Sequence, residues 1–224
     1  MPGPAPSPTR LRVDFVSDVV CPWCAIGLAS LEQALARTRG EVEADLHFQP
    51  FELNPQIGPE GEDVLAYLQQ KYGMTAAQVA ANQESIRQRG AALGFTFDME
   101  RRRRTYNTFD AHRLLHWAGE EGRQRELKHA LLRAYFTDGR DVSNHDTLVG
   151  IAVSVGLPAD RVRGILASDT YADDVRTAEE FFQQHGINAV PAVIIERKHL
   201  ISGGQPVEVF ERALREIAAA KQPA

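Results

Sequence analysis

The pattern of apolar and polar positions changes character twice along the chain. Residues 10–16 have the apolar-rich pattern of a strand, and apolar residues at helical spacing follow over about 22–38. Apolar and polar residues then alternate over 42–48, which predicts a second strand. A cluster of Pro, Asn and Gly after residue 50 ends regular structure. The first part of the chain therefore predicts a strand, a helix and a second strand.

From about residue 60 to residue 180 the pattern is helical almost throughout. Thr75 and Asn107 are residues of the kind that caps helix N-termini, and each stands before apolar residues at helical spacing. Two more short helices are expected over 144–155 and 158–166. Another helix is expected over 172–184, with Gly186 as its C′ residue. No internal repeat is apparent.

Strand signals return near the C-terminal end. Apolar runs at 192–195 and around 199–202 predict two strands, and a turn at Gly203 leads to a last helix opened by Pro206. Because neither end of the chain has enough strands for a stable sheet alone, we expect both ends to pair in one sheet. The predicted division is a discontinuous domain of residues 10–59 and 181–220, a helical insertion domain over 60–180, and disordered tails at 1–9 and 221–224.

Composition narrows the possible functions. The chain has 224 residues, is 43% hydrophobic and 25% charged, and has a formal net charge of −5, which argues against general nucleic-acid binding. No apolar run approaches the ~18 residues of a transmembrane helix, so no membrane partner is expected. The Pro-rich N-terminus lacks the apolar core of a secretory signal, and a cytoplasmic location is expected. Oligomeric state has no signature in the sequence.

The two cysteines stand where the first strand meets the first helix, in the sequence Cys21-Pro22-Trp23-Cys24. Pro22 suits the first helical turn, where its missing N–H removes no helical hydrogen bond. The positive end of the helix dipole favours a thiolate at Cys21, and Cys24 lies about one turn further, within reach of a disulfide. Structural disulfides are rare in the cytoplasm, so we interpret the pair as redox-active rather than as a structural disulfide or two inert core cysteines.

Several neighbouring residues suggest weaker hypotheses. Trp23 is either an exposed aromatic platform for apolar substrate or a side chain packed against the insertion. Asp18 would oppose ionisation of Cys21 if the two lay close. His112 and His116 have the spacing of a zinc-binding pair, but they lie far from the cysteines in sequence and on an amphipathic helix, so no metal is expected.

The run Arg101–Arg104 is the most basic stretch of the chain. It follows two acidic residues and precedes a helix, which is typical of a solvated or ion-paired linker. The alternative is a clamp for a carboxylate or phosphate, from glutathione or another anion.

The order of elements resembles the thioredoxin superfamily: an α/β thioredoxin fold, βαβ…ββα, with a large all-helical insertion. CPWC follows the first strand, and Val190-Pro191 precedes the third. More closely, the chain resembles the DsbA family, in the FrnE-like branch related to kappa-class glutathione transferases and 2-hydroxychromene-2-carboxylate isomerases. Besides these two motifs, the likeness rests on residues 51–55 (FELNP), 107–114 (NTFDAHRL), 186–191 (GINAVP) and 201–210 (ISGGQPVEVF).

The resemblance implies a role for individual residues. Cys21 matches an exposed nucleophilic cysteine and Cys24 a buried resolving cysteine. Pro191 matches the cis-proline that faces the disulfide, and the backbone of Val190 would pair with a substrate chain or with glutathione. The other expected substrate-binding residues are Pro22, Trp23 and, from the family-like segment of the insertion, His112.

The function implied is that of a thiol–disulfide oxidoreductase that works through a mixed disulfide. It needs no cofactor beyond the Cys21–Cys24 disulfide, and its partners would be disulfide- or thiol-containing proteins or glutathione. One alternative is a glutathione-dependent transferase or isomerase, but those relatives typically carry Ser where Cys21 stands, so two cysteines favour redox chemistry. The other alternative is a non-enzymatic redox-sensing module.

Overall fold

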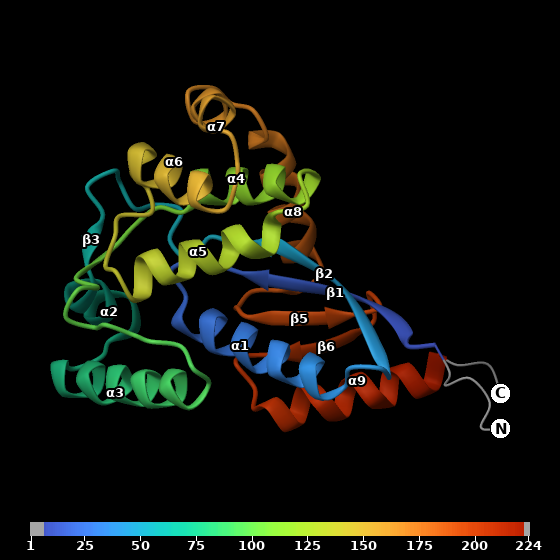
Figure 1. The fold of residues 1–224 in the computed structure, drawn as a ribbon. Coiled ribbons are helices and arrows are strands. Elements are labelled where there is room, and N and C mark those ends of the chain that lie inside the picture. The colour runs from blue at the N-terminus through green and yellow to red at the C-terminus, as the bar shows by residue number, and fades with distance from the viewer. Residues whose placement is uncertain (1–6, 222–224) are drawn as a thin grey trace, which may run out of the picture.

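A four-stranded sheet with helices on both sides forms the centre of the protein (Figure 1). The structure is a computed structural model that describes residues 7–221. The strands lie in the order β2-β1-β5-β6. Their bounds are Thr9–Ser17 for β1, Val42–Pro50 for β2, Ala192–Ile195 for β5 and His199–Ser202 for β6.

The central strand β1 joins the two ends of the chain. It pairs in parallel with β2 and antiparallel with β5, which pairs antiparallel with β6. Leu11, Val13 and Phe15 are fully buried, and so is Val16 on the opposite face of the strand, because β1 is covered on both sides. The prediction that both ends of the chain contribute to one sheet is confirmed, and with it the thioredoxin-type order of elements.

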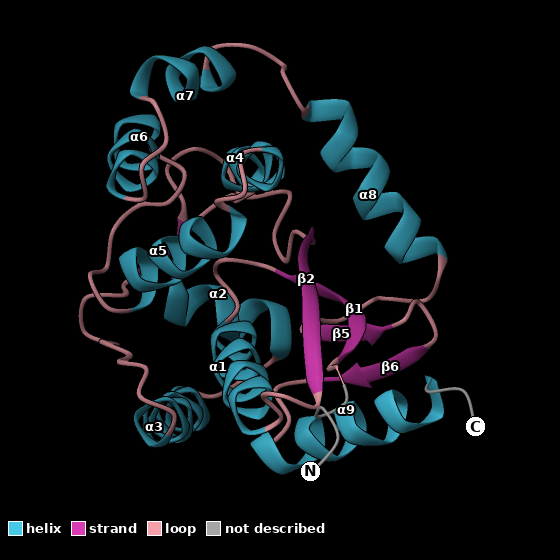
Figure 2. Ribbon diagram, turned by 45° about the vertical axis from the view of Figure 1, so that its right-hand side comes forward, coloured by secondary structure: helices cyan, strands magenta, loops and turns pink. Residues whose placement is uncertain are grey.

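Helices from both parts of the chain cover this sheet. Helices α1 and α9 lie side by side, and α9 also contacts β1, whereas α4, α5 and α8 contact β2 (Figures 1 and 2). The described helices are α1 (Pro22–Arg37), α2 (Val64–Tyr72), α3 (Ala76–Ala92), α4 (Phe109–Glu120), α5 (Gln124–Phe136), α6 (His145–Ser154), α7 (Ala159–Leu166), α8 (Ala172–Gln184) and α9 (Val207–Lys221).

Local capping explains where several helices begin and end. Thr75 caps α3 in a capping box, as predicted. The side chain of Asn144 caps α6. Asn107 differs from the prediction, because the N-cap position of α4 is one residue later and the Asn107 side chain accepts a hydrogen bond from the N–H of Phe109 in a local turn. Gly186 follows α8 with a φ of +84°, as a C′ glycine does.

The structure differs from the prediction in three respects. The insertion is not entirely helical, because β3 (Glu62–Asp63) and β4 (Arg104–Thr105) pair in a small antiparallel sheet. Strand β1 begins at residue 9 and α9 continues to residue 221, inside the predicted tails; the rest of those tails, apart from residues 7 and 8, lies outside the described residues. The predicted limit after residue 180 falls within α8, a continuous helix that packs on β2. The division into two domains stays a prediction.

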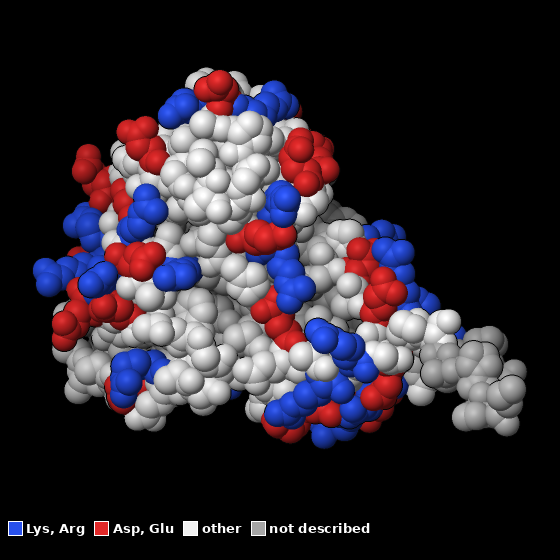
Figure 3. Space-filling view, viewed as in Figure 1, with Lys and Arg blue, Asp and Glu red and all other residues white. Residues whose placement is uncertain are grey.

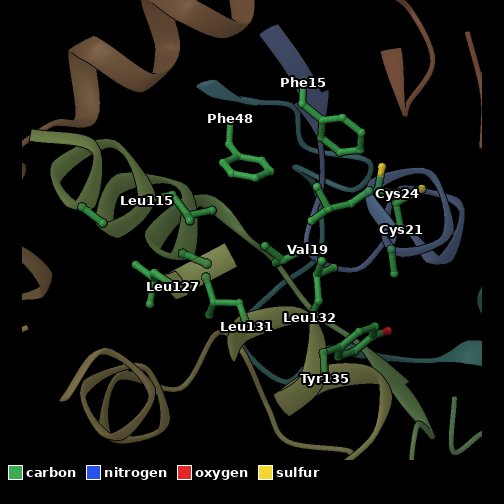
Figure 4. Packing of buried hydrophobic residues seen from close by; sticks show 14 of the residues in the cluster. Phe15, Val19, Cys21, Cys24, Phe48, Leu115, Leu127, Leu131, Leu132 and Tyr135 are labelled. Atoms are coloured by element: carbon green, nitrogen blue, oxygen red, sulfur yellow. The ribbon is translucent and has the colours of Figure 1, made fainter. Parts of the chain in front are cut away.

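The insertion shares its hydrophobic core with the sheet. Phe15 and Phe48 of the sheet belong to the same buried cluster as Leu131 and Leu132 of α5 (Figure 4). The side-chain amide of Gln124 accepts from the N–H and donates to the C=O of Phe48, which attaches α5 to the edge of β2. Because this packing is continuous, α5 brings its side chains close to the strand that leads into the cysteines.

The surface and the helices show two further properties. Acidic and basic side chains are interspersed over the face seen in Figure 3, so this face lacks the extended basic patch that nucleic-acid binding requires. No helix in the range 7–221 combines the length and the apolar character needed to cross a membrane.

Candidate active site

Both cysteines lie in the first turn of α1. Cys21 is the N-cap residue, with extended backbone angles, and Pro22 opens the helix. The C=O of Cys21 accepts hydrogen bonds from the N–H groups of Cys24 and Ala25, at 3.1 and 3.3 Å. Both cysteines are free thiols. The strand–helix junction therefore holds two thiols next to each other, as the sequence predicts.

The two thiols have different surroundings. Cys24 is fully buried, as expected. Cys21 is only 3% exposed, so the prediction of an exposed Cys21 is wrong. The segment before Pro191 covers it, and the Cys21 thiol donates a 3.7 Å hydrogen bond to the C=O of Val190. Cys21 nevertheless lines a cleft of about 630 Å³, whereas Cys24 does not. The cleft therefore gives access to the cysteine pair through Cys21.

The cleft lies between the Cys21–Cys24 motif and the insertion. Pro22, Trp23 and Val190 line it with Cys21, and side chains of α2 and α3 line the other side. Trp23 is partly buried, and the guanidinium of Arg89 in α3 lies 5.0 Å from the centre of its ring. The ring therefore packs against the insertion, as one interpretation of Trp23 predicts, and it also borders the cleft; its role as a platform for substrate stays a prediction.

The Val190–Pro191 segment forms the wall beside Cys21. The peptide bond between these residues is cis. The C=O of Pro191 accepts a hydrogen bond from the N–H of Gly203, which anchors the segment to the end of β6. No residue in the described part of the chain accepts a hydrogen bond from the N–H of Val190. That group is available to a ligand in the cleft, whereas Pro191 itself does not line it.

A buried polar layer lies behind the cysteines. Asp18 is fully buried and accepts hydrogen bonds from the N–H groups of Leu53 (2.7 Å) and Val20 (3.4 Å). The Nε2 atom of His112 lies 3.5 Å from its carboxylate. Burial opposes ionisation of Asp18, but His112 and the Leu53 N–H outweigh it and keep the pKa of Asp18 below its ordinary value. The carboxylate thus faces Leu53 and His112 from the base of the site.

His112 does not lie at the cleft that contains Cys21, and its contact with substrate stays a prediction. His112 is buried and does not line the cleft; it lines a separate cavity of about 540 Å³ between β2, α4 and α5. The reason is the direction of α4, which turns this residue toward Asp18 beneath the sheet end. The sequence showed that His112 stands in an amphipathic helix, but not which partner that helix face meets.

Lys128 of α5 is the residue of this layer that sequence reasoning missed. It is fully buried, and its Nζ has no hydrogen-bond partner within residues 7–221. Burial lowers the pKa of Lys128, and the neighbouring Cys24 and Asp18 oppose that shift. Its position three and four residues before Leu131 and Leu132, on an apolar helix face, was a signal that could have identified it.

The buried surroundings also affect the pKa of Cys24. Burial, and then the adjacent Cys21 thiol, raise the pKa of Cys24 well above its ordinary value, while Lys128 acts in the opposite direction. Cys24 is therefore held as a thiol when the pair is reduced. One thiol, Cys21, therefore lines the cleft, and the other, Cys24, lies buried beneath it.

Comparison with known proteins agrees with this geometry. Residues 12–215 match the model of the DSBA-like thioredoxin domain family. The chain belongs to the DsbA-like family. A crystal structure of a probable DsbA oxidoreductase from Streptomyces coelicolor is 39% identical, with a TM-score of 0.87 over 96% of this chain and 92% of that chain. The uncharacterized protein YwbO of Bacillus subtilis is 29% identical over 91% of this chain and 96% of its own length.

A more distant DsbA-like structure shares the fold. The cytosolic disulfide reductase DsbM of Pseudomonas aeruginosa, solved with GSH, is 14% identical, with a TM-score of 0.63 over 93% of this chain and 99% of that chain. At this identity the likeness concerns the fold alone, and it agrees with the thioredoxin fold that the family match indicates.

Metal ligands are not grouped in the part of this DsbA-like chain that the structure describes. No three side chains of His, Cys, Asp or Glu lie close enough together there to hold a metal ion. His116, the second histidine of the zinc-like spacing, stacks against Tyr171 instead, with ring centres 5.2 Å apart.

The close approach of α1 to the cis-proline segment requires a glycine. A Cβ atom at Gly27 would lie 3.1 Å from Cγ of Pro191 and 3.4 Å from Cα of Gly204. The side-chain-free position lets the first turns of α1 pack directly against the segment that holds Val190 beside Cys21. Gly27 therefore contributes to the geometry of the site without lining the cleft.

Replacing Gly27 by alanine is expected to destabilise the protein by about 1–3 kcal/mol, because the added methyl group overpacks the contact with Pro191. The matched control is Gly164→Ala in α7, where no atom lies within 4 Å of the added Cβ. That substitution should be neutral or stabilising by up to ~1 kcal/mol, the gain in helix propensity. Urea unfolding measures both variants, and equal effects would contradict the role of Gly27.

Proposed function

We propose that this protein is a thiol–disulfide oxidoreductase in which Cys21 exchanges with the substrate and Cys24 resolves the intermediate. One observation supports this most directly: two free thiols share the first turn of α1, one lining a cleft and the other fully buried beneath it. Thiol–disulfide exchange needs one accessible sulfur and a second within reach. Retention of both cysteines also favours this reaction over the transferase or isomerase alternative.

The proposed reaction proceeds in two exchanges. The thiolate of Cys21 attacks one sulfur of a substrate disulfide, forms a mixed disulfide, and releases the other sulfur as a thiolate that takes up a proton. Cys24, after losing its proton, attacks the sulfur of Cys21 and releases the second substrate thiol. The substrate disulfide is reduced to two thiols while the protein dithiol is oxidised to the Cys21–Cys24 disulfide, and the reverse sequence oxidises a substrate.

The protein's own groups order these two steps. The hydrogen bond to Val190 holds the Cys21 sulfur at the cleft wall, and the free N–H of Val190 is placed to bind substrate backbone. The raised pKa of Cys24 keeps it protonated until the mixed disulfide has formed. Lys128 acts against the raised pKa of Cys24, and in this way it assists the resolving step.

The proposed substrates are disulfide- or thiol-containing proteins or glutathione, with no cofactor other than the cysteine pair. The description of DsbM as a cytosolic disulfide reductase, and its structure with GSH, support this choice and the cytoplasmic setting that belongs to the same proposal. A redox-sensing module would share the disulfide but would not turn over substrate.

Trapping the intermediate tests the proposed roles. Cys24→Ser is expected to accumulate a mixed disulfide with glutathione through Cys21 when it is incubated with oxidised glutathione, because the resolving thiol is missing. Intact-mass spectrometry with peptide mapping locates the adduct. Cys21→Ser is the matched control and should form none, since Cys24 is fully buried. An adduct at neither cysteine, together with absence of insulin-disulfide reduction by the wild type, would contradict the proposal.

A further inference from the structure

The basic run Arg101–Arg104 is divided by the fold. Arg101 forms an ion pair with Asp98 at 3.2 Å, and Arg103 and Arg104 donate to backbone carbonyl groups of nearby residues. These three side chains are exposed, as expected of a linker. Arg102, in contrast, is 9% exposed and lines the cleft that contains Cys21.

The surroundings of Arg102 leave its charge without an anion. Its Nε donates to the hydroxyl of Tyr135 at 3.2 Å, and its guanidinium lies over the rings of Tyr135 and Phe136, 5.4 and 5.2 Å from their centres. Its Nη1 lies 4.0 Å from the sulfur of Met99. No carboxylate of residues 7–221 lies within salt-bridge distance of it. Burying a guanidinium without a counter-charge is unfavourable unless a ligand supplies the charge.

The charged residues that line the cleft also favour an anionic ligand. Its charged lining residues are Glu52, Lys71 and Arg102. Glu52 is already paired with Arg176, outside the cleft lining. The Nζ of Lys71 donates to neutral acceptors, the C=O of Leu53 and the side-chain oxygen of Asn54. Two cations without carboxylate partners therefore face the same cleft as Cys21.

We propose that Arg102 binds a carboxylate of the substrate, so that the cleft selects disulfides in which a negative charge lies close to the cysteine. This inference rests on the proposed function and specifies the substrate class of the same site. A guanidinium offers a planar pair of N–H donors that matches a carboxylate, and the aromatic rings behind Arg102 hold that plane in place. A small acidic peptide disulfide and an acidic stretch of a polypeptide both carry this group.

The apolar part of the cleft suits the remainder of such a ligand. Tyr67, Leu68, Tyr72 and Ile86 line it together with Trp23. These side chains provide surface for the carbon atoms of a substrate, whereas Arg102 supplies the specific polar contact. The redox exchange at Cys21 is unchanged by this role.

The test compares pairs of disulfides that differ in charge. The rate constant for single-turnover oxidation of the reduced protein is measured with oxidised glutathione and with its glycine ethyl diester, and with cystine peptides that carry Glu or Gln beside the cysteine. The wild type is expected to prefer the acidic member of at least one pair by about tenfold, the scale of one charge-assisted hydrogen bond. The pair that shows the preference identifies the source of the carboxylate as small or polypeptide.

Variants then assign the preference to one residue. In Arg102→Gln the ratio of acidic to uncharged rate should fall to about one, and Arg102→Lys should keep part of it. The matched control is Arg103→Gln, which removes the same charge from an exposed position of the same run and should keep the wild-type ratio. Because each ratio is internal to one variant, a loss of stability does not imitate the result.

Two outcomes would overturn the role of Arg102: a wild type without preference in either pair, or equal losses of preference in Arg102→Gln and Arg103→Gln. Failure of the proposed function itself would be distinguishable, because the wild type would then react with none of the four disulfides.

Discussion

Cys21→Ser is expected to lower the rate of insulin-disulfide reduction at least about a thousandfold, the scale on which loss of a nucleophile acts. Cys21 is the cysteine that lines the cleft, and Cys24 is fully buried with a raised pKa, so the second thiol cannot take its place. The assay follows the precipitation of the reduced insulin chains in the presence of a regenerating thiol.

The substitution changes one atom, which makes the control direct. The circular dichroism spectrum and the melting temperature of Cys21→Ser should match those of the reduced wild type, because the buried volume is nearly conserved. If Cys21→Ser kept most of the activity and Cys24→Ser lost it, the assignment of attacking and resolving cysteine would be reversed.

Asp18→Asn is expected to destabilise the protein by roughly 2–4 kcal/mol at neutral pH, because it replaces a fully buried carboxylate that accepts backbone hydrogen bonds and faces His112. Asp18 is fully buried, lies 3.5 Å from His112, and is electrostatically coupled to Lys128. The matched control is Asp160→Asn, an exposed carboxylate 3.6 Å from Arg163 in α7, which should change stability by less than ~0.5 kcal/mol. Urea unfolding measures both.

The effect of Asp18→Asn should depend on pH with a defined sign. The pKa of Asp18 in the folded protein lies below the ordinary value of 3.8. The carboxylate therefore stabilises the fold fully above that ordinary value and loses its contribution as the pH falls through the folded pKa. The difference between wild type and variant should be largest at neutral pH and narrow below about pH 4. A difference that stays constant from pH 7 to pH 3 would contradict this account.

The same variant tests the expectation that Asp18 opposes ionisation of Cys21. The carboxylate is oriented toward Leu53 and His112, and its backbone C=O accepts from the N–H of Cys21 at 3.4 Å. Thiolate absorbance followed against pH in wild type and Asp18→Asn measures the effect directly, and identical titration curves would remove that expectation.

Features that depend on neighbouring residues were predictable from sequence. The strand that runs into Cys21, the helix opened by Pro22 and the cap Thr75 follow from local spacing, backbone preference and short-range hydrogen bonds. The pairing of the two chain ends was also predictable, because too few strands remain at either end for a sheet. Val190 was placed at the cleft only through the resemblance to the family.

Features that depend on which surfaces meet were decided by the tertiary structure. A helical pattern shows that His112 and Lys128 share a face with apolar residues, but it does not show that those faces meet Asp18 below the cysteines. The four consecutive arginines are equivalent in sequence, yet only Arg102 lies in the cleft, because the short β3–β4 pairing and the rings of α5 direct it inward. Periodicity determined which residues are buried together along one element; the partners of their charges came from elements distant in the chain, whose packing no local pattern specifies.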